Sequence, residues 1–95
     1  MDALLIGLNH RTAAVELRER VAFTAAECRE AAGQLRDRGI LKEALVLSTC
    51  NRSEVYGVPA TSCGDPMGDV EQFMPSFHSF RLEELGEACY RLRGP

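Results

Sequence analysis

The segment from Ser48 to Glu54 gathers side chains whose types and spacing could carry out chemistry. Cys50 is flanked by Thr49 and Asn51, and Arg52 follows two residues after the cysteine. A guanidinium close to a thiol favours the thiolate, which is the nucleophilic form of cysteine. These residues therefore indicate a reactive thiol. The alternative is a cysteine that closes a buried core strand, which is the common fate of a free cysteine.

An apolar run, Ala44 to Leu47, leads directly into this segment. It contains no charge and no turn former, and a short run of this kind is typical of a strand buried on both faces. We expect one strand over Glu43–Cys50 and the next over Ser53–Val58, joined by a two-residue turn of Asn51 and Arg52. A bulged or wider turn is the alternative, because arginine adopts positive φ less readily than asparagine.

The chain begins with an apolar strand that ends in a polar loop. Residues 3–8 are apolar and lead into Asn9, His10 and Arg11. Gly7 inside the strand either weakens it or lets another backbone or a substrate come close. His10 could serve a site at this strand end, and the alternative is a loop histidine bonded to the backbone.

Two helices are expected between the first and second strands. A short one covers residues 14–22. The longer one begins at a capping box formed by Thr24 and Glu27, runs to about Arg38 and ends at Gly39. Cys28 lies on the apolar face of this helix, so we expect it to be a small core residue.

The last third of the chain predicts one further helix and a fourth strand. Residues 59–68 form a loop with Cys63 exposed, and a helix follows from about Asp69, which Pro75 either kinks or delays. A short helical turn over 79–86 leads to a strand over 88–93. Its alternation places Ala88, Tyr90 and Leu92 inward and Cys89, Arg91 and Arg93 outward. The two outward arginines could meet nucleic-acid phosphates, or they form an ordinary solvated face of an edge strand.

The order strand, helices, strand, strand, helix, strand predicts an α+β protein. A ferredoxin-like βαββαβ sandwich fits it, with a four-stranded, mainly antiparallel sheet and helices on one face. Ninety-five residues make one small domain, here residues 1–95. The net charge of -3 gives no basic field for wholesale nucleic-acid binding.

Composition also argues against several classes of site. The four cysteines show no C-x-x-C spacing, so we expect no metal site. The sequence has no signal-peptide pattern and no stretch able to span a membrane, so we expect a cytoplasmic chain with unpaired thiols.

The segment Ser48–Tyr56 resembles the active-site segment of glutamyl-tRNA reductase. Two other segments, Leu5–Ala13 and Leu17–Phe23, agree with the same family in order and spacing. The resemblance covers about the first sixty residues well and the remainder loosely.

The resemblance implies an NADPH-dependent oxidoreductase that acts on glutamyl-tRNA. The Cys50 thiolate would attack the ester that joins glutamate to its tRNA and form a thioester, which NADPH reduces to glutamate-1-semialdehyde for 5-aminolevulinate and tetrapyrrole biosynthesis. Arg52 would bind the glutamate carboxylate, a task suited to a planar bidentate cation. The alternative for Arg52 is a surface arginine that pairs with Glu54 or with solvent. Thr49 and Asn51 would hydrogen-bond the glutamyl group.

The resemblance also implies parts that this sequence does not contain. The family's enzyme is several times longer and adds an NADPH-binding domain and a helical dimerisation domain, whereas no G-x-G-x-x-G occurs here. The family's important histidine follows the last strand, and His78 does not match its position. We therefore expect an N-terminal catalytic-domain fragment that is inactive alone in the full reaction.

The partners follow from the same resemblance. They are glutamyl-tRNA, a second subunit bound through the absent domain of the homodimer, and glutamate-1-semialdehyde aminomutase as the acceptor of the product. A noncatalytic ferredoxin-like binding or regulatory module is the alternative function.

Overall fold

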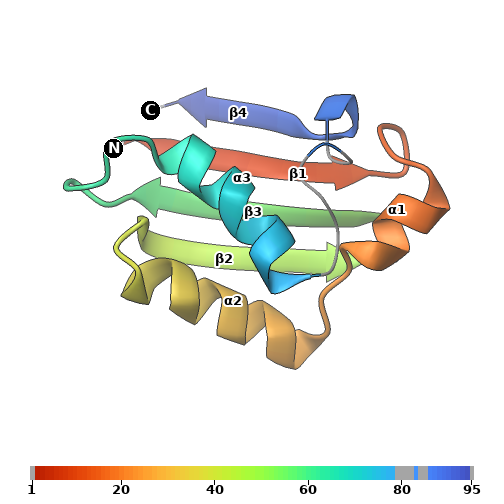
Figure 1. Ribbon diagram of the computed structural model, residues 1–95, viewed down its shortest axis with the longest axis horizontal. Helices are drawn as coiled ribbons and strands as arrows, with labels where there is room; N and C mark the ends of the chain where they lie inside the picture. Colours follow the sequence, from red (N-terminus) through yellow and green to blue (C-terminus); the bar gives the residue numbers. More distant parts are fainter. Residues whose placement is uncertain (1, 79–82, 84–85, 95) are drawn as a thin grey trace.

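The computed structural model describes residues 2–78, 83 and 86–94, and it consists of a sheet with helices packed on one side (Figure 1). The strands are β1 (Ala3–Asn9), β2 (Leu41–Thr49), β3 (Arg52–Pro59) and β4 (Tyr90–Gly94). The helices are α1 (Val15–Arg20), α2 (Ala25–Asp37) and α3 (Pro66–Phe77), with a short 3₁₀ helix η1 (Gly86–Ala88). The strand order is β2-β3-β1-β4 and each neighbouring pair is antiparallel, which confirms the predicted ferredoxin-like fold.

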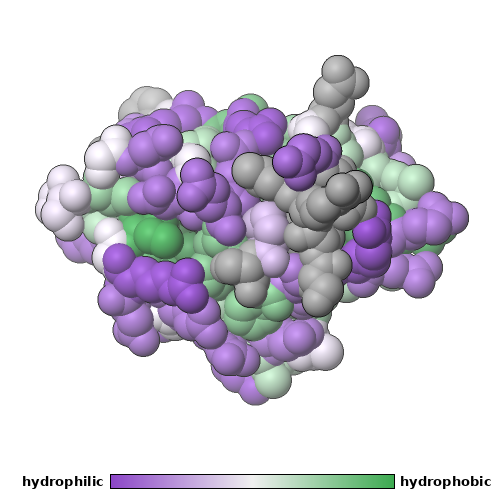
Figure 2. Space-filling view, in the orientation of Figure 1, coloured by the Kyte–Doolittle hydropathy of each residue, from purple (hydrophilic) through white to green (hydrophobic). Residues whose placement is uncertain are grey.

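The hydrophobic core lies between the sheet and helices α2 and α3 (Figure 1). Leu4, Ile6 and Leu8 alternate along β1 and are all buried on this side. The helices contribute Ala31, Ala32, Leu35, Val70, Phe73 and Met74. The outer surface in this orientation is mostly hydrophilic, with small hydrophobic areas (Figure 2). Among the described residues, no helix combines the length and the apolar character needed to cross a membrane.

Local signals fix the ends of α2 as predicted. Thr24 Oγ1 accepts a hydrogen bond from the Glu27 amide at 3.1 Å, and Glu27 Oε1 accepts one from the Thr24 amide at 2.8 Å. Gly39 follows the helix with φ of 74°, a conformation that glycine adopts without strain. Cys28 is half-buried against the core, where burial raises the pKa of its thiol.

Helix α3 begins earlier than predicted. Asp65 caps it by accepting a hydrogen bond from the Gly68 amide at 3.2 Å, and Pro66 occupies the first turn. The helix continues through Pro75 to Phe77. The predicted helical turn over 79–86 lies largely outside the described residues.

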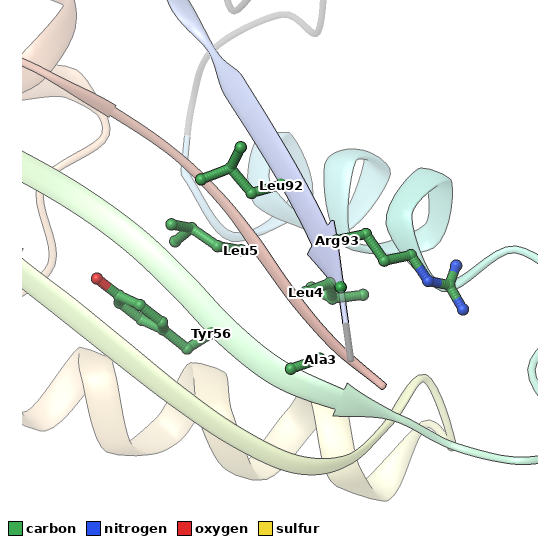
Figure 3. A pocket seen from close by; sticks show the side chains of 7 residues that line it. Ala3, Leu4, Leu5, Tyr56, Leu92 and Arg93 are labelled. Carbon is green, nitrogen blue, oxygen red and sulfur yellow. The ribbon is translucent and has the colours of Figure 1, made fainter. Parts of the chain in front are cut away.

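The prediction that the second strand is buried on both faces is wrong. β2 is an edge strand, and on the side away from the helices Leu45 is 61% exposed. Its neighbours across this open face are Tyr56, Leu5 and Leu92, in register on β3, β1 and β4. The four side chains form an apolar row across the sheet, and a groove of about 350 Å³ lies beside Leu5, Tyr56 and Leu92 (Figure 3).

The predicted orientation of the last strand is also wrong. Cys89 is buried, whereas Leu92 points to the open face and is 61% exposed. Arg91 pairs with Glu71 of α3, and Arg93 points away from Leu92 (Figure 3). The alternation alone did not reveal which side of the strand the helices cover.

Candidate functional site

Cys50 lies in the tight turn between β2 and β3, at one end of the sheet. Thr49 and Arg52 are directly paired across the two strands, so the turn consists of Cys50 and Asn51, one residue earlier than predicted. Neither Cys50 nor Asn51 has a positive φ, so the turn forms without the left-handed backbone conformation. Thr49 Oγ1 accepts a hydrogen bond from the Asn51 amide at 3.2 Å. Cys50 is exposed at the tip rather than closing a buried strand.

The end of β1 lies beside this turn, because Asn9 is the register partner of Arg52. The Asn9 side-chain oxygen accepts hydrogen bonds from the amides of Arg11 at 2.9 Å and Thr12 at 3.2 Å. These bonds fold the loop after β1 back on itself. His10 is exposed in this loop.

Arg18 of α1 connects that loop to the turn. Its Nη1 donates to the carbonyl oxygen of Ala13 at 2.8 Å, and its Nε donates to the carbonyl oxygen of Cys50 at 3.3 Å. Arg18 therefore holds the backbone of Cys50, and its guanidinium lies next to the Cys50 carbonyl. Arg18 is not predictable as a site residue from the sequence, because the contact joins residues 32 positions apart and no local pattern marks it.

Serine hydroxyls anchor the same hairpin from the helix side. Ser48 Oγ lies 2.8 Å from Ser53 Oγ, and the Phe23 amide donates to Ser48 Oγ at 2.9 Å. Ser53 is buried. The polar residues around Cys50 therefore divide in two: the serines support the turn, while Thr49, Asn51 and Arg52 are exposed.

Arg52 faces a buried carboxylate on the open side of the sheet. Its Nη1 lies 3.6 Å from Glu54 Oε1. Tyr56 donates its hydroxyl to the same oxygen at 2.8 Å, and Tyr90 donates to the other oxygen, Oε2. The hydrogen bond to Glu54 raises the pKa of Tyr56, and burial followed by the bond to Glu54 raises the pKa of Tyr90. Pairing with Glu54 is the alternative that the sequence predicts for Arg52, and the structure shows this contact. No local pattern marks Tyr90, which lies 36 positions from Glu54.

The other cysteines differ from Cys50. Cys89 is buried. Cys63 is half-buried, not exposed as predicted, because its thiol donates to Asp69 Oδ2 at 3.2 Å. Burial raises the pKa of both thiols. Among the four cysteines, which all lie in the described part of the chain, Cys50 alone is exposed.

His78 does not take part in this arrangement. Its ring packs against those of Phe23 and Phe77, with centroids 4.4 Å and 5.2 Å away. Within the described residues, no group of three or more histidine, cysteine or acidic side chains could hold a metal ion.

These features define a ferredoxin-like domain with an exposed thiol on a hairpin turn, where Arg18 bonds the backbone carbonyl of Cys50 and Arg52 begins the following strand. Such a site can take an acyl group onto sulfur and bind a carboxylate beside it. The family described as glutamyl-tRNAGlu reductase, N-terminal domain, matches residues 6–95. The chain therefore belongs to this family.

Individual relatives agree with the family match. The chain is 40% identical over 90 residues to the glutamyl-tRNA reductase of Marinobacter nauticus and 41% identical over 92 residues to that of Chromohalobacter salexigens, in each case over 95% of the chain and 20% of the relative. It thus spans about a fifth of the length of these relatives. The structure of glutamyl-tRNA reductase from Methanopyrus kandleri superposes with a TM-score of 0.67 at 24% identity, covering 97% of this chain and 19% of that one, and it shows the same fold.

Proposed function

We propose that this domain performs the acyl-transfer half of glutamyl-tRNA reduction, with Cys50 as the nucleophile. The thiolate attacks the ester carbonyl of glutamyl-tRNA, a carbon–sulfur bond forms, and the ester bond to the terminal ribose breaks. The ribose oxygen leaves with a proton and the glutamyl group stays on sulfur as a thioester. The exposed position of Cys50 at the turn is the observation that carries this proposal, because a large tRNA ester can reach a thiol only at the surface.

The flanking residues supply the contacts to the glutamyl group. Arg52 is exposed and has the planar donor geometry that matches a carboxylate. The Thr49 hydroxyl oxygen already accepts the Asn51 amide, so its O–H proton is available to a substrate oxygen. The Asn51 side chain lies exposed on the same turn and offers both a donor and an acceptor.

The reduction step is not assigned to residues of this chain. Its sequence has no G-x-G-x-x-G, so these residues do not fit the phosphates of a dinucleotide. The proposal places the use of NADPH, and with it the formation of glutamate-1-semialdehyde for tetrapyrrole synthesis, in the part of the reductase that this chain does not match. A homodimer and transfer of the product to the aminomutase belong to that larger protein as well.

Intact mass spectrometry after mixing the folded chain with glutamyl-tRNA tests the proposal. We expect a glutamyl adduct on the parent and on Cys63→Ser, and none on Cys50→Ser. Cys63→Ser is the matched control, because it removes a half-buried thiol outside the site. A folded parent without any adduct would refute the acyl-transfer role and favour a noncatalytic binding module.

A further inference from the structure

Glu54 is a buried carboxylate on the open face of the sheet, and it lies between Arg52 and two tyrosines. Its side chain is 5% exposed, whereas that of Arg52 is 45% exposed. A buried carboxylate is costly unless its oxygens are hydrogen-bonded. Here Tyr56 donates to Oε1 and Tyr90 donates to Oε2. We refer to Arg52, Glu54, Tyr56 and Tyr90 as the Glu54 cluster.

Tyr90 reaches Glu54 across an intervening strand because that strand has a glycine at the crossing point. Gly7 of β1 is the register partner of both Glu54 on β3 and Tyr90 on β4. A Cβ at Gly7 would lie 2.7 Å from Glu54 Cγ and 2.6 Å from the Ser53 carbonyl oxygen. The missing side chain thus makes the room in which the Glu54 side chain lies.

Arg52 is close to Glu54 without a tight bond to it. The Nη1–Oε1 distance is 3.6 Å, whereas a direct charge-assisted bond is about 2.7–2.9 Å. Tyr56 already occupies Oε1 at 2.8 Å, and Tyr90 holds the other oxygen. Within the described residues, the guanidinium makes no hydrogen bond, so its donors are available.

We propose that the Glu54 cluster positions Arg52 for a ligand carboxylate: the two tyrosines occupy the oxygens of Glu54, so its charge directs the guanidinium without consuming the donors. If a tyrosine hydroxyl were lost, Glu54 would have an oxygen free to pair directly with Arg52 and would compete with the ligand. Tyr56, Tyr90 and Glu54 are positioning residues in this scheme. The inference rests on the proposed function, in which the carboxylate belongs to the glutamyl group.

Alkylation of Cys50 by two small reagents tests the inference without tRNA. Iodoacetate carries a carboxylate and iodoacetamide does not, and each forms a carbon–sulfur bond with loss of iodide. In a Cys63→Ser background we expect Tyr56→Phe to lower the iodoacetate-to-iodoacetamide rate ratio at Cys50 by about two- to fivefold, the range of an exposed ion pair. Peptide mapping locates the alkylated cysteine, and circular dichroism checks that each variant is folded.

The fall in the iodoacetate-to-iodoacetamide ratio caused by Tyr56→Phe must depend on the charge of Glu54. In a Glu54→Gln background, Tyr56→Phe should leave the ratio unchanged, because an amide does not compete for Arg52. Tyr90→Phe provides a second variant that acts on the other oxygen, and it should lower the ratio in the same direction. A ratio that is unaffected by both tyrosine substitutions, or one that falls equally in the Glu54→Gln background, would overturn the inference.

Thioester formation with glutamyl-tRNA links the cluster to the proposed function. Tyr56→Phe should raise the half-saturating concentration of glutamyl-tRNA about two- to fivefold and leave the maximal rate of acylation close to that of the parent. If the parent forms no thioester while the reagent ratios change as expected, the proposed function fails and the role of the cluster stands. If the parent forms the thioester and Tyr56→Phe leaves both the half-saturating concentration and the ratios unchanged, the role of the cluster fails alone.

Discussion

Replacing Gly7 with alanine should destabilise the domain, although alanine is the better residue in most positions. The added Cβ would lie 2.6 Å from the Ser53 carbonyl oxygen, 2.7 Å from Glu54 Cγ and 2.9 Å from Glu54 Cα. Two of these neighbours are backbone atoms that cannot rotate away, and overpacking of this kind costs about 1–3 kcal/mol. The higher backbone entropy of glycine in the unfolded chain offsets about 0.5–1 kcal/mol of this. The net loss then lies between about 0 and 2.5 kcal/mol, and we expect the free energy of unfolding to fall by about 1 kcal/mol.

Urea unfolding followed by circular dichroism measures this effect, and Gly33→Ala is the matched control. Gly33 lies inside α2, and a Cβ there would meet nothing closer than Arg36 Nη2 at 4.0 Å. The same substitution should therefore stabilise the domain at this position by about 0.5–1 kcal/mol. If the free energy of unfolding falls in Gly7→Ala and rises in Gly33→Ala, the close contact of Glu54 and Ser53 with Gly7 is supported. A Gly7→Ala variant stabilised as much as Gly33→Ala would refute the close approach of Glu54 to Gly7.

Three further predictions concern the core, the site and pH. Leu8→Ala should lower the free energy of unfolding by about 2–5 kcal/mol, whereas Leu92→Ala should change it by less than about 1 kcal/mol, because Leu8 is 0% and Leu92 61% exposed; urea unfolding of both variants checks this. Arg18→Met keeps most of the apolar stem but loses the bonds to the Cys50 and Ala13 carbonyls, so thioester formation should slow by about tenfold in maximal rate while the fold persists. Burial lowers the pKa of His78 below 6.5, so the unfolded chain takes up a proton first and stability should fall as the pH drops through 6.5. Thermal melts at pH 7.5 and 5.5 should show a smaller difference in His78→Gln, and an unchanged difference would contradict this assignment.

The sequence predicted those features that local chemistry controls. The Thr24 and Glu27 capping box and the Gly39 stop depend on residues within a few positions of each other, and both are present in the structure. The order of helices and strands along the chain predicted the fold class, and local patterns are enough to establish that order. The segment around Cys50 was located at a strand end, with an error of one residue in the turn.

The errors came from properties that depend on the order of strands in the sheet. Ala44 to Leu47 is a continuous apolar run, and such a run fits a central buried strand as well as an edge strand with one apolar open face. The structure places it at the edge, where Leu45 joins the exposed row. Tyr90 and Leu92 were assigned to the wrong face for the same reason, since the alternation of β4 does not say which side carries the helices.

The open face shows why the contact between Glu54 and Tyr90 could not be predicted from the sequence. Tyr90 lies 36 positions from Glu54, and the two meet only because β1 inserts between their strands with Gly7 at the crossing point. A glutamate and a tyrosine in two separate strands predict no contact by themselves. Along the open face, the apolar row of Leu45, Tyr56, Leu5 and Leu92 is followed by Glu54, Gly7 and Tyr90, and then by the exposed Arg52 next to the turn that carries Cys50. Arg52 is therefore exposed on this face, whereas the carboxylate of Glu54 is buried and bonded to both tyrosines.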